Sequence, residues 1–225
     1  MIAERDLGLG RLPILDERDK NYPMSALLAA PLPTKVEGLT TPTPGDYYWQ
    51  VVPPYVNQKN RPICVGAAWE HWLNSPPLRT RDGPDPETIY HEAQLIDEWP
   101  GEEPAYEGTS VRAGAKYLKT AGRIASYYWA QSLAEIVEFI KTRGPVVFGS
   151  YWYSGMFQPL PNGLVQVSCA IAGGHAFLVY GMSENAKLVR CLNSWGDWGQ
   201  GGGFWLTFAD FERLFKQDGE AVAAI

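Results

Sequence analysis

Residues 57–72 read NQKNRPICVGAAWEHW, a polar loop that changes into a run of small and apolar residues. Because Pro62 fixes φ at a value suited to a first helical turn, we expect a mostly buried helix from Cys64 to about Leu73. A thiol at a helix N-terminus faces unpaired N–H groups and the positive end of the helix dipole, which favour the thiolate. Upstream, Gln58 offers an amide N–H for an oxyanion. The stretch predicts a nucleophilic cysteine at the head of a helix.

A cysteine taken alone is more often a buried core residue than a nucleophile, so a base and an orienting group must be found elsewhere. Residues 173–181 read GGHAFLVYG, and residues 189–205 read VRCLNSWGDWGQGGGFW. The first segment is typical of a glycine-led strand containing His175, and the second of a strand that ends at Asn193 before a glycine-rich turn. Two adjacent antiparallel strands would place His175 beside Asn193.

Taken together, these segments resemble the papain-like cysteine peptidases. The Asn-Ser-Trp-Gly-x-Trp-Gly string is specific, and it follows Gln-x5-Cys and Gly-His in the order that the family shows. The resemblance implies Cys64 as nucleophile, His175 as general base and acid, Asn193 as the group that orients the imidazole, and Gln58 as an oxyanion-hole donor. It also implies that Trp195 shields the contact between His175 and Asn193 from water.

The same resemblance suggests residues that contact the substrate. In the family, a glycine-containing segment before the helix expected at residues 111–120 lines the cleft, which implies substrate binding by Gly108 and Thr109. An ordinary helix N-cap explains those two residues equally well. Gly174 and Trp195, which adjoin the predicted triad, complete the expected substrate-binding set.

The segment around the nucleophile departs from the usual family pattern. Residues 61–65 read RPICV where the family commonly has Cys-Gly-Ser/Ala-Cys-Trp/Tyr, so Arg61 replaces a cysteine that normally forms a disulfide. Cys64 and His175 are also closer in sequence than the roughly 130–150 residues typical of the lysosomal type. The chain resembles a compact, disulfide-poor branch found in bacteria and phages, and substrate preference does not carry over.

Composition narrows the class of protein further. The chain has 225 residues and a net charge of −6, without a basic cluster, which argues against a nucleic-acid partner. We expect no membrane span, no signal peptide, no metal and no cofactor, and a cytoplasmic or virion-associated location. Three cysteines are few and odd in number, so Cys169 and Cys191 are expected to be buried, reduced thiols, with a disulfide between them as the alternative. His71 and His91 are expected to be partly exposed surface imidazoles.

The chain divides into an extended Pro/Gly-rich arm at residues 1–46 and a catalytic domain at residues 47–225. The domain is expected to be α+β and papain-like, with a helical part at about 57–143 and a β part at about 145–225. A helical layer that carries the nucleophile would face a barrel-like antiparallel sheet that carries His and Asn. Expected helices cover 64–73, 85–99, 111–120, 132–142 and 209–215; expected strands cover 47–52, 124–130, 146–153, 164–170, 175–182, 187–193, 203–207 and 221–225.

The function expected from this reading is hydrolysis of amide bonds in a peptide or protein substrate through a thioester acyl-enzyme. The arm either covers the cleft, packs as a belt or contacts a partner. Two other classes remain open: a non-catalytic structural or interaction protein with a papain-like fold, such as a phage particle component, and a cell-wall amidase or transpeptidase.

Overall fold

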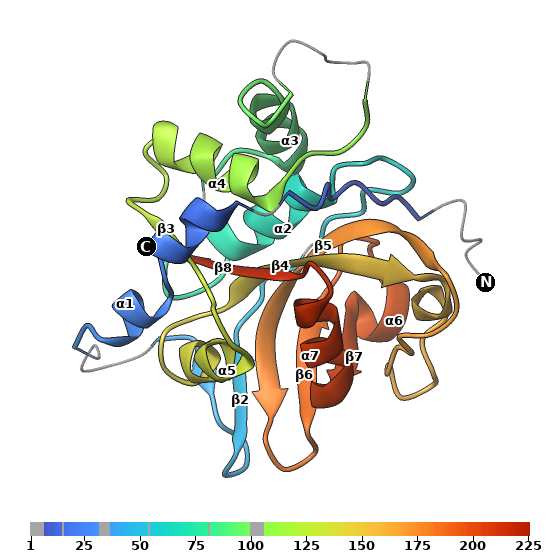
Figure 1. The fold of residues 1–225 in the computed structure, drawn as a ribbon. Helices are drawn as coiled ribbons and strands as arrows, with labels where there is room; N and C mark the ends of the chain where they lie inside the picture. The colour runs from blue at the N-terminus through green and yellow to red at the C-terminus, as the bar shows by residue number, and fades with distance from the viewer. Residues whose placement is uncertain (1–6, 15, 32–36, 54, 81, 100–105) are drawn as a thin grey trace.

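The computed structural model describes residues 7–14, 16–31, 37–53, 55–80, 82–99 and 106–225. Within these ranges the predicted α+β architecture is confirmed, with a group of helices on one side of an antiparallel sheet (Figure 1). The helices are α1 (Ser25–Leu28), α2 (Cys64–Leu73), α3 (Pro86–Gln94), α4 (Val111–Thr120), α5 (Leu133–Thr142), α6 (Trp198–Gly201) and α7 (Phe208–Lys216), with 3₁₀ turns η2 (Glu17–Asn21) and η3 (Ser154–Phe157). The strands are β1 (Leu39–Thr40), β2 (Asp46–Trp49), β3 (Tyr127–Trp129), β4 (Val146–Tyr153), β5 (Ile171–Ser183), β6 (Leu188–Leu192), β7 (Gly203–Thr207) and β8 (Glu220–Ala224).

Local capping explains where most of the helices begin. The Asp85 side chain accepts hydrogen bonds from the N–H groups of Glu87 and Thr88 at the start of α3. Ser110 and Ser132 cap α4 and α5 in the same way. A side-chain oxygen at the N-cap satisfies N–H groups that have no partner inside the helix, so these starts are encoded locally.

Strand β5 organises the sheet. It is the longest strand among the described residues, and it pairs antiparallel with β2, β4 and β6. β6 pairs in turn with β7, while β4 continues the sheet through β8 to β3. Because β5 and β6 are neighbours, residues near the start of β5 lie next to the chain that leaves the end of β6.

Two hydrophobic clusters form the core on either side of the sheet. One contains aromatic side chains of the β half, including Phe148, Trp152 and Phe177. The other joins α2 and α4 to the sheet and contains Trp69 and Leu118. The helical layer therefore packs on one face of the sheet, and α2 lies directly against β4 and β5.

Four sequence predictions are corrected by the structure. The helix predicted for 85–99 ends at Gln94, because the chain then turns so that the Asp97 carboxylate accepts hydrogen bonds from Trp99 N–H and Thr109 Oγ1. The segment predicted as a strand at 164–170 makes a tight turn, with Ser168 N–H bonded to Gln166 O at 2.8 Å. Cys169 follows that turn at φ +68° and is exposed rather than buried.

The predicted exposure of His71 on α2 is the fourth correction. His71 is buried, and its Nε2 accepts a hydrogen bond from Val56 N–H at 3.2 Å. It faces the packed interior because α2 is surrounded by α3, α4 and the sheet. His91 is exposed on α3, as predicted.

The arm lies against the domain wherever it is described; residues 1–6, 15 and 32–36 lie outside the described part. Residues 7–14 run between the helical layer and the sheet, where Figure 1 shows the dark blue chain passing α2 and α4. Further along, Met24 N–H bonds to Trp129 O at 2.7 Å, and β1 pairs with β2. The division into an arm at 1–46 and a domain at 47–225 stays a prediction.

Candidate active site

Cys64 is the first residue of α2 and has no exposed surface (0%). Its sulfur lies close to the backbone of Ala176, the residue that follows His175 on β5, and close to the backbone of Val65. Packing of α2 against β4 and β5 thus brings the head of the helix to the strand that carries the histidine.

His175 and Asn193 meet as the strand pairing predicts. Nε2 of His175 lies 2.7 Å from Oδ1 of Asn193, and both side chains are buried. The Trp195 ring stacks on the imidazole, with centroids 4.6 Å apart and planes 24° apart, while Trp152 contacts the imidazole edge-on at 5.0 Å. Among the described residues, Nδ1 of His175 has no hydrogen-bond partner. Since Nε2 is engaged by Asn193, Nδ1 is the nitrogen left to exchange a proton.

Gln58 is held in the loop before α2. Its backbone N–H bonds to Ser194 O at 2.8 Å, and Ser194 Oγ donates to Gln58 Oε1. These contacts direct the amide nitrogen, which donates to Arg61 O at 2.6 Å and to Gly8 O at 3.1 Å. Gln58 and Asn193 are therefore tied together through Ser194, a residue that the sequence analysis did not single out.

Gly8 and Gly10 of the N-terminal segment contact this site. The carbonyl oxygen of Gly8 accepts hydrogen bonds from Gln58 Nε2 and from Trp195 Nε1, each at 3.1 Å. Gly10 approaches the loop before Cys64 so closely that a Cβ at that position would lie 2.0 Å from Pro62 O. The main-chain carbonyl of Gly8 thus accepts a hydrogen bond from Gln58 Nε2, the group that the sequence predicts as a donor to the oxyanion.

The expected substrate-binding residues contact the arm backbone. Gly10 N–H and Arg11 N–H both bond to Gly174 O at 3.0 Å. Thr109 N–H bonds to Gly10 O, and Leu12 N–H bonds to Thr109 O, each at 2.9 Å. The structure therefore brings Thr109, Gly174 and Trp195 together along one run of chain. Gly108 lies beside it at φ +99°, where an added Cβ would meet Gly10 O at 2.6 Å.

Burial affects the protonation of both Cys64 and His175. Desolvation raises the pKa of the Cys64 thiol to about 12, although nearby backbone groups of Ala176, Gly10 and Val65 offset part of this increase. Desolvation likewise lowers the pKa of His175 to about 4, against the effect of the hydrogen bond to Asn193. The thiolate expected from the helix N-terminus is not favoured in this conformation, because loss of water outweighs the helix dipole.

Gly8, Gly10 and Arg11 were missed by the sequence analysis as residues of the site. The only local signal is the Gly-Leu-Gly-Arg run at residues 8–11, in which small residues alternate with larger ones. Such a run allows close backbone approach, but it does not say which surface is approached.

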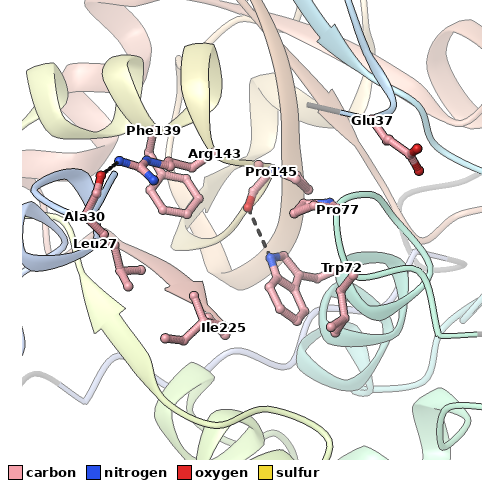
Figure 2. Close-up of a pocket in the computed structure, with 12 residues that line it drawn as sticks. Leu27, Ala30, Glu37, Trp72, Pro77, Phe139, Arg143, Pro145 and Ile225 are labelled. Atoms are coloured by element: carbon pink, nitrogen blue, oxygen red, sulfur yellow. Dashed lines mark hydrogen bonds between the residues drawn. The ribbon is translucent and has the colours of Figure 1, made fainter. Parts of the chain in front are cut away.

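The chain also has a pocket of about 530 Å³, and Figure 2 shows the residues that line it. Its wall joins Leu27 of α1 to Trp72 of α2, Phe139 of α5 and Ile225. The Trp72 indole donates to Pro145 O at 3.1 Å, and Arg143 donates to Ala30 O, as the dashed lines in Figure 2 show. The pocket shares no residue with the triad or with Gln58.

The described residues contain no group of three or more His, Cys, Asp or Glu side chains that could hold a metal ion. No helix in the described ranges has the length and apolar character needed to cross a membrane.

A helix headed by a cysteine packs here on an antiparallel sheet that carries His175 and leads to Asn193, and the chain has the fold of the papain-like cysteine proteases. Solved structures support the assignment. Xylellain, a cysteine protease from Xylella fastidiosa, is similar with a TM-score of 0.67 and 19% identity over 100% of both chains. ProCathepsin B S9 from Trypanosoma congolense gives a TM-score of 0.55 at 12% identity, over 96% of this chain and 82% of its own.

A plant enzyme of the same fold is also similar. The cysteine protease CMS1MS2 from Carica candamarcensis gives a TM-score of 0.56 at 15% identity, over 81% of this chain and 98% of its own. No protein-family model and no curated protein matches the sequence. At these identities the likeness establishes the fold, and the activity has to be argued from the site.

Proposed function

We propose that the chain is a cysteine peptidase that hydrolyses amide bonds through Cys64, His175 and Asn193. The observation that carries the proposal is the 2.7 Å contact between His175 Nε2 and Asn193 Oδ1 beneath the stacked Trp195 ring. A core histidine has no need of a buried amide partner, a covering indole and an unpartnered second nitrogen. An imidazole that must hold one tautomer and exchange a proton at Nδ1 needs all three.

In the proposed mechanism Nδ1 of His175 takes the thiol proton, and the Cys64 sulfur adds to the carbonyl carbon of the substrate. The resulting oxyanion accepts hydrogen bonds from Gln58 Nε2 and from the backbone N–H of Cys64. Collapse breaks the C–N bond, and the imidazolium gives its proton to the leaving amine. Water, activated by neutral His175, then attacks the thioester, which releases the carboxylic acid and restores the thiol.

The conformation described here would be a resting form of that enzyme. Gly8 O occupies the Gln58 donor, and Cys64 and His175 are both shielded from water. A substrate reaches the sulfur only after residues 8–11 leave the cleft. Their departure would readmit water and polar substrate groups, which lowers the desolvation that now keeps the thiol and imidazole neutral.

The experiment is alkylation of the full chain by limiting iodoacetamide and by a thiol-reactive epoxide between pH 4 and 9, read by intact mass. Because Cys169 is exposed and free, all variants carry Cys169→Ser. The proposal expects one adduct, absent in Cys64→Ala, and a rate at pH 5–6 that falls strongly in His175→Ala. Cleavage of an unfolded protein substrate should be lost in both variants.

A second candidate function rests on the burial of the site. A non-catalytic protein of this fold would keep Cys64 and His175 at 0% exposure permanently, with the arm as a structural strap. In that case Cys64 would be alkylated only as the pH approaches ~8.5, the pKa of an ordinary thiol, or not at all. Substitutions that displace the arm would not change this result.

A further inference from the structure

His71 lies on α2, the helix that Cys64 begins, and its side chain reaches the loop that precedes this helix. The residue is 5% exposed, and its Nε2 lies 3.2 Å from the backbone nitrogen of Val56. Because a backbone N–H can only donate, Nε2 is the acceptor and the proton of the neutral ring is on Nδ1. Burial lowers the pKa of His71 to about 4, which keeps the ring neutral.

The other ring nitrogen of His71 shows that packing alone does not account for this residue. Among the described residues, Nδ1 of His71 is buried and has no hydrogen-bond partner. A buried N–H without an acceptor is unfavourable, and an apolar side chain would fill the same space without this penalty. The Tyr55 ring contacts the imidazole edge-on, with centroids 6.4 Å apart. What an apolar residue could not supply is the acceptor for the Val56 N–H.

Val56 is the end of a short backbone ladder between the loop before α2 and the chain that leaves β6. Gly196 N–H donates to Val56 O at 3.0 Å, and Gln58 N–H donates to Ser194 O at 2.8 Å. The residues between these two bonds form an antiparallel bridge. His71 holds the remaining backbone group of Val56, so the loop is supported from α2 as well as from the chain after β6.

The Gln58 side chain depends on this ladder for its direction. Its backbone is held at Ser194 O, and Ser194 Oγ holds the amide at Oε1. With both points fixed, the position of Nε2 follows from the position of the loop. A misplacement of about 1 Å in a group that acts on the reaction can reduce the rate by on the order of 10²-fold.

We propose that His71 is a positioning residue of the peptidase, which accepts the Val56 N–H and thereby fixes the loop that directs Gln58 Nε2 at the oxyanion. His71 acts through the backbone and touches neither the substrate nor the reacting atoms. Its effect on rate rests on the proposed peptidase function, whereas its effect on the loop does not.

Three full-length variants separate the acceptor from the packing. His71→Gln keeps an acceptor oxygen, whereas His71→Leu fills the space and has none. Trp72→Phe is the matched control, because it also removes one hydrogen bond between α2 and a backbone group. That bond runs from Trp72 Nε1 to Pro145 O at 3.1 Å and joins α2 to the start of β4 instead of to the loop.

The first measurement follows the loop without any turnover. Hydrogen–deuterium exchange is read by mass spectrometry on peptides that cover residues 55–58 and 194–196. In His71→Leu the exchange of these peptides should be faster than in the native chain by on the order of 10-fold, since the ladder opens more often. His71→Gln and Trp72→Phe should match the native chain there. Native exchange in His71→Leu, or an equal increase in Trp72→Phe, would overturn the proposal.

The second measurement compares kcat with KM for cleavage of an unfolded protein or peptide substrate. His71→Leu should lower kcat by on the order of 10–100-fold with KM largely unchanged, and His71→Gln should restore most of it. In the Gln58→Ala background the same substitution should cost little more, because the donor that His71 positions is already gone. Fully additive losses would show that His71 does not act through Gln58.

The positioning role and the peptidase function fail differently. If the native chain cleaves peptides and His71→Leu keeps its kcat, the positioning role is refuted and the peptidase stands. If Cys64 is inert and no peptide is cleaved, the peptidase is refuted, and exchange still decides whether His71 holds the loop. If His71→Leu does not fold, His71→Phe fills the space with a ring that lacks an acceptor, and the same differences from His71→Gln are expected.

Discussion

Gln58 shows how a single amide can serve both the resting chain and the proposed reaction. Its Nε2 now donates to Gly8 O, and its Oε1 accepts from Ser194. A sequence pattern could assign Gln58 as an oxyanion donor, because the distance to Cys64 along a loop is short. It could not reveal that the arm already uses this donor, because that contact spans 50 residues.

Gln58→Ala should reduce kcat for peptide cleavage by about 10²–10³-fold, since the proposed mechanism then loses one of its two oxyanion donors. Alkylation of Cys64 by iodoacetamide forms no oxyanion, so the alkylation rate should be the same in Gln58→Ala as in the native chain. Parallel measurement of both rates checks the role. An equal decrease in the two rates would show that Gln58 acts on the sulfur or on folding instead.

Arg11 and Glu220 form a buried ion pair, with 2.9 Å between Arg11 Nη2 and Glu220 Oε1, and this pair makes a prediction about stability. Glu220→Gln leaves an uncompensated buried guanidinium and should lower the free energy of unfolding by about 3–5 kcal/mol. Arg11→Met/Glu220→Gln removes both charges and should recover most of that loss. Urea unfolding of the two variants and of Arg11→Met completes the cycle. Strictly additive effects would mean that the two charges do not interact.

At the level of elements, the parts encoded locally were predicted best. Helix α4 has the predicted bounds because Ser110 caps it, and β4 has them because its apolar run is continuous. The segment at 164–170 has a strand-like composition. In the structure it forms a loop that is joined to β7 by an isolated bridge between Leu164 and Trp205. A strand-like composition means that the residues would pack well against neighbouring strands, and the sequence does not show whether such strands are present.

The arm is the element whose path could not be predicted. Its prolines and glycines indicate an extended chain, yet its position depends on contacts such as the bond from Arg112 Nε to Asp19 Oδ1 at 3.1 Å. That contact joins residues 93 positions apart. Neither periodicity nor capping carries information about such pairs.

Gly10→Val tests whether the arm controls access to Cys64. The added Cβ would lie 2.0 Å from Pro62 O, so the arm cannot keep its place over the sulfur. In the Cys169→Ser chain we expect alkylation of Cys64 to become faster by on the order of 10-fold or more, as a clash of this size disfavours the closed form. Lys20→Ala, at an exposed arm residue, is the matched control and should leave the rate unchanged. An unaltered rate in Gly10→Val would exclude the arm as the barrier.

For the molecule as a whole, buried histidines set a dependence of stability on pH. Burial lowers the pKa of His71 and of His175 to about 4 each. The unfolded chain binds protons at these sites below about pH 6.5 while the native chain does not, so stability should fall as pH decreases from about 6.5 to 4. Burial raises the pKa of Glu70 to about 7, and this contribution works in the opposite direction, since it is largest at low pH and is lost as pH rises to 7.

His71→Gln separates these effects. The glutamine oxygen can accept the Val56 N–H but cannot bind a proton in this range. Between pH 6.5 and 4.5, its free energy of unfolding should therefore fall less than that of the native chain, by an amount on the order of 3 kcal/mol at most. Urea titrations at several pH values provide the measurement. Identical pH profiles would show that His71 titrates in the folded chain much as it does in the unfolded one.

The attachment of residues 8–11 to the same polypeptide has a kinetic consequence. A tethered occupant has an effective concentration fixed by the length and stiffness of its connection, in the millimolar range for short flexible links. Diluting the protein cannot release it, and a competing peptide must match that local concentration to enter. For the peptidase proposed here, the arm would raise the apparent KM while leaving kcat at saturating substrate unchanged. Release would become permanent only when the covalent connection to the arm is cut.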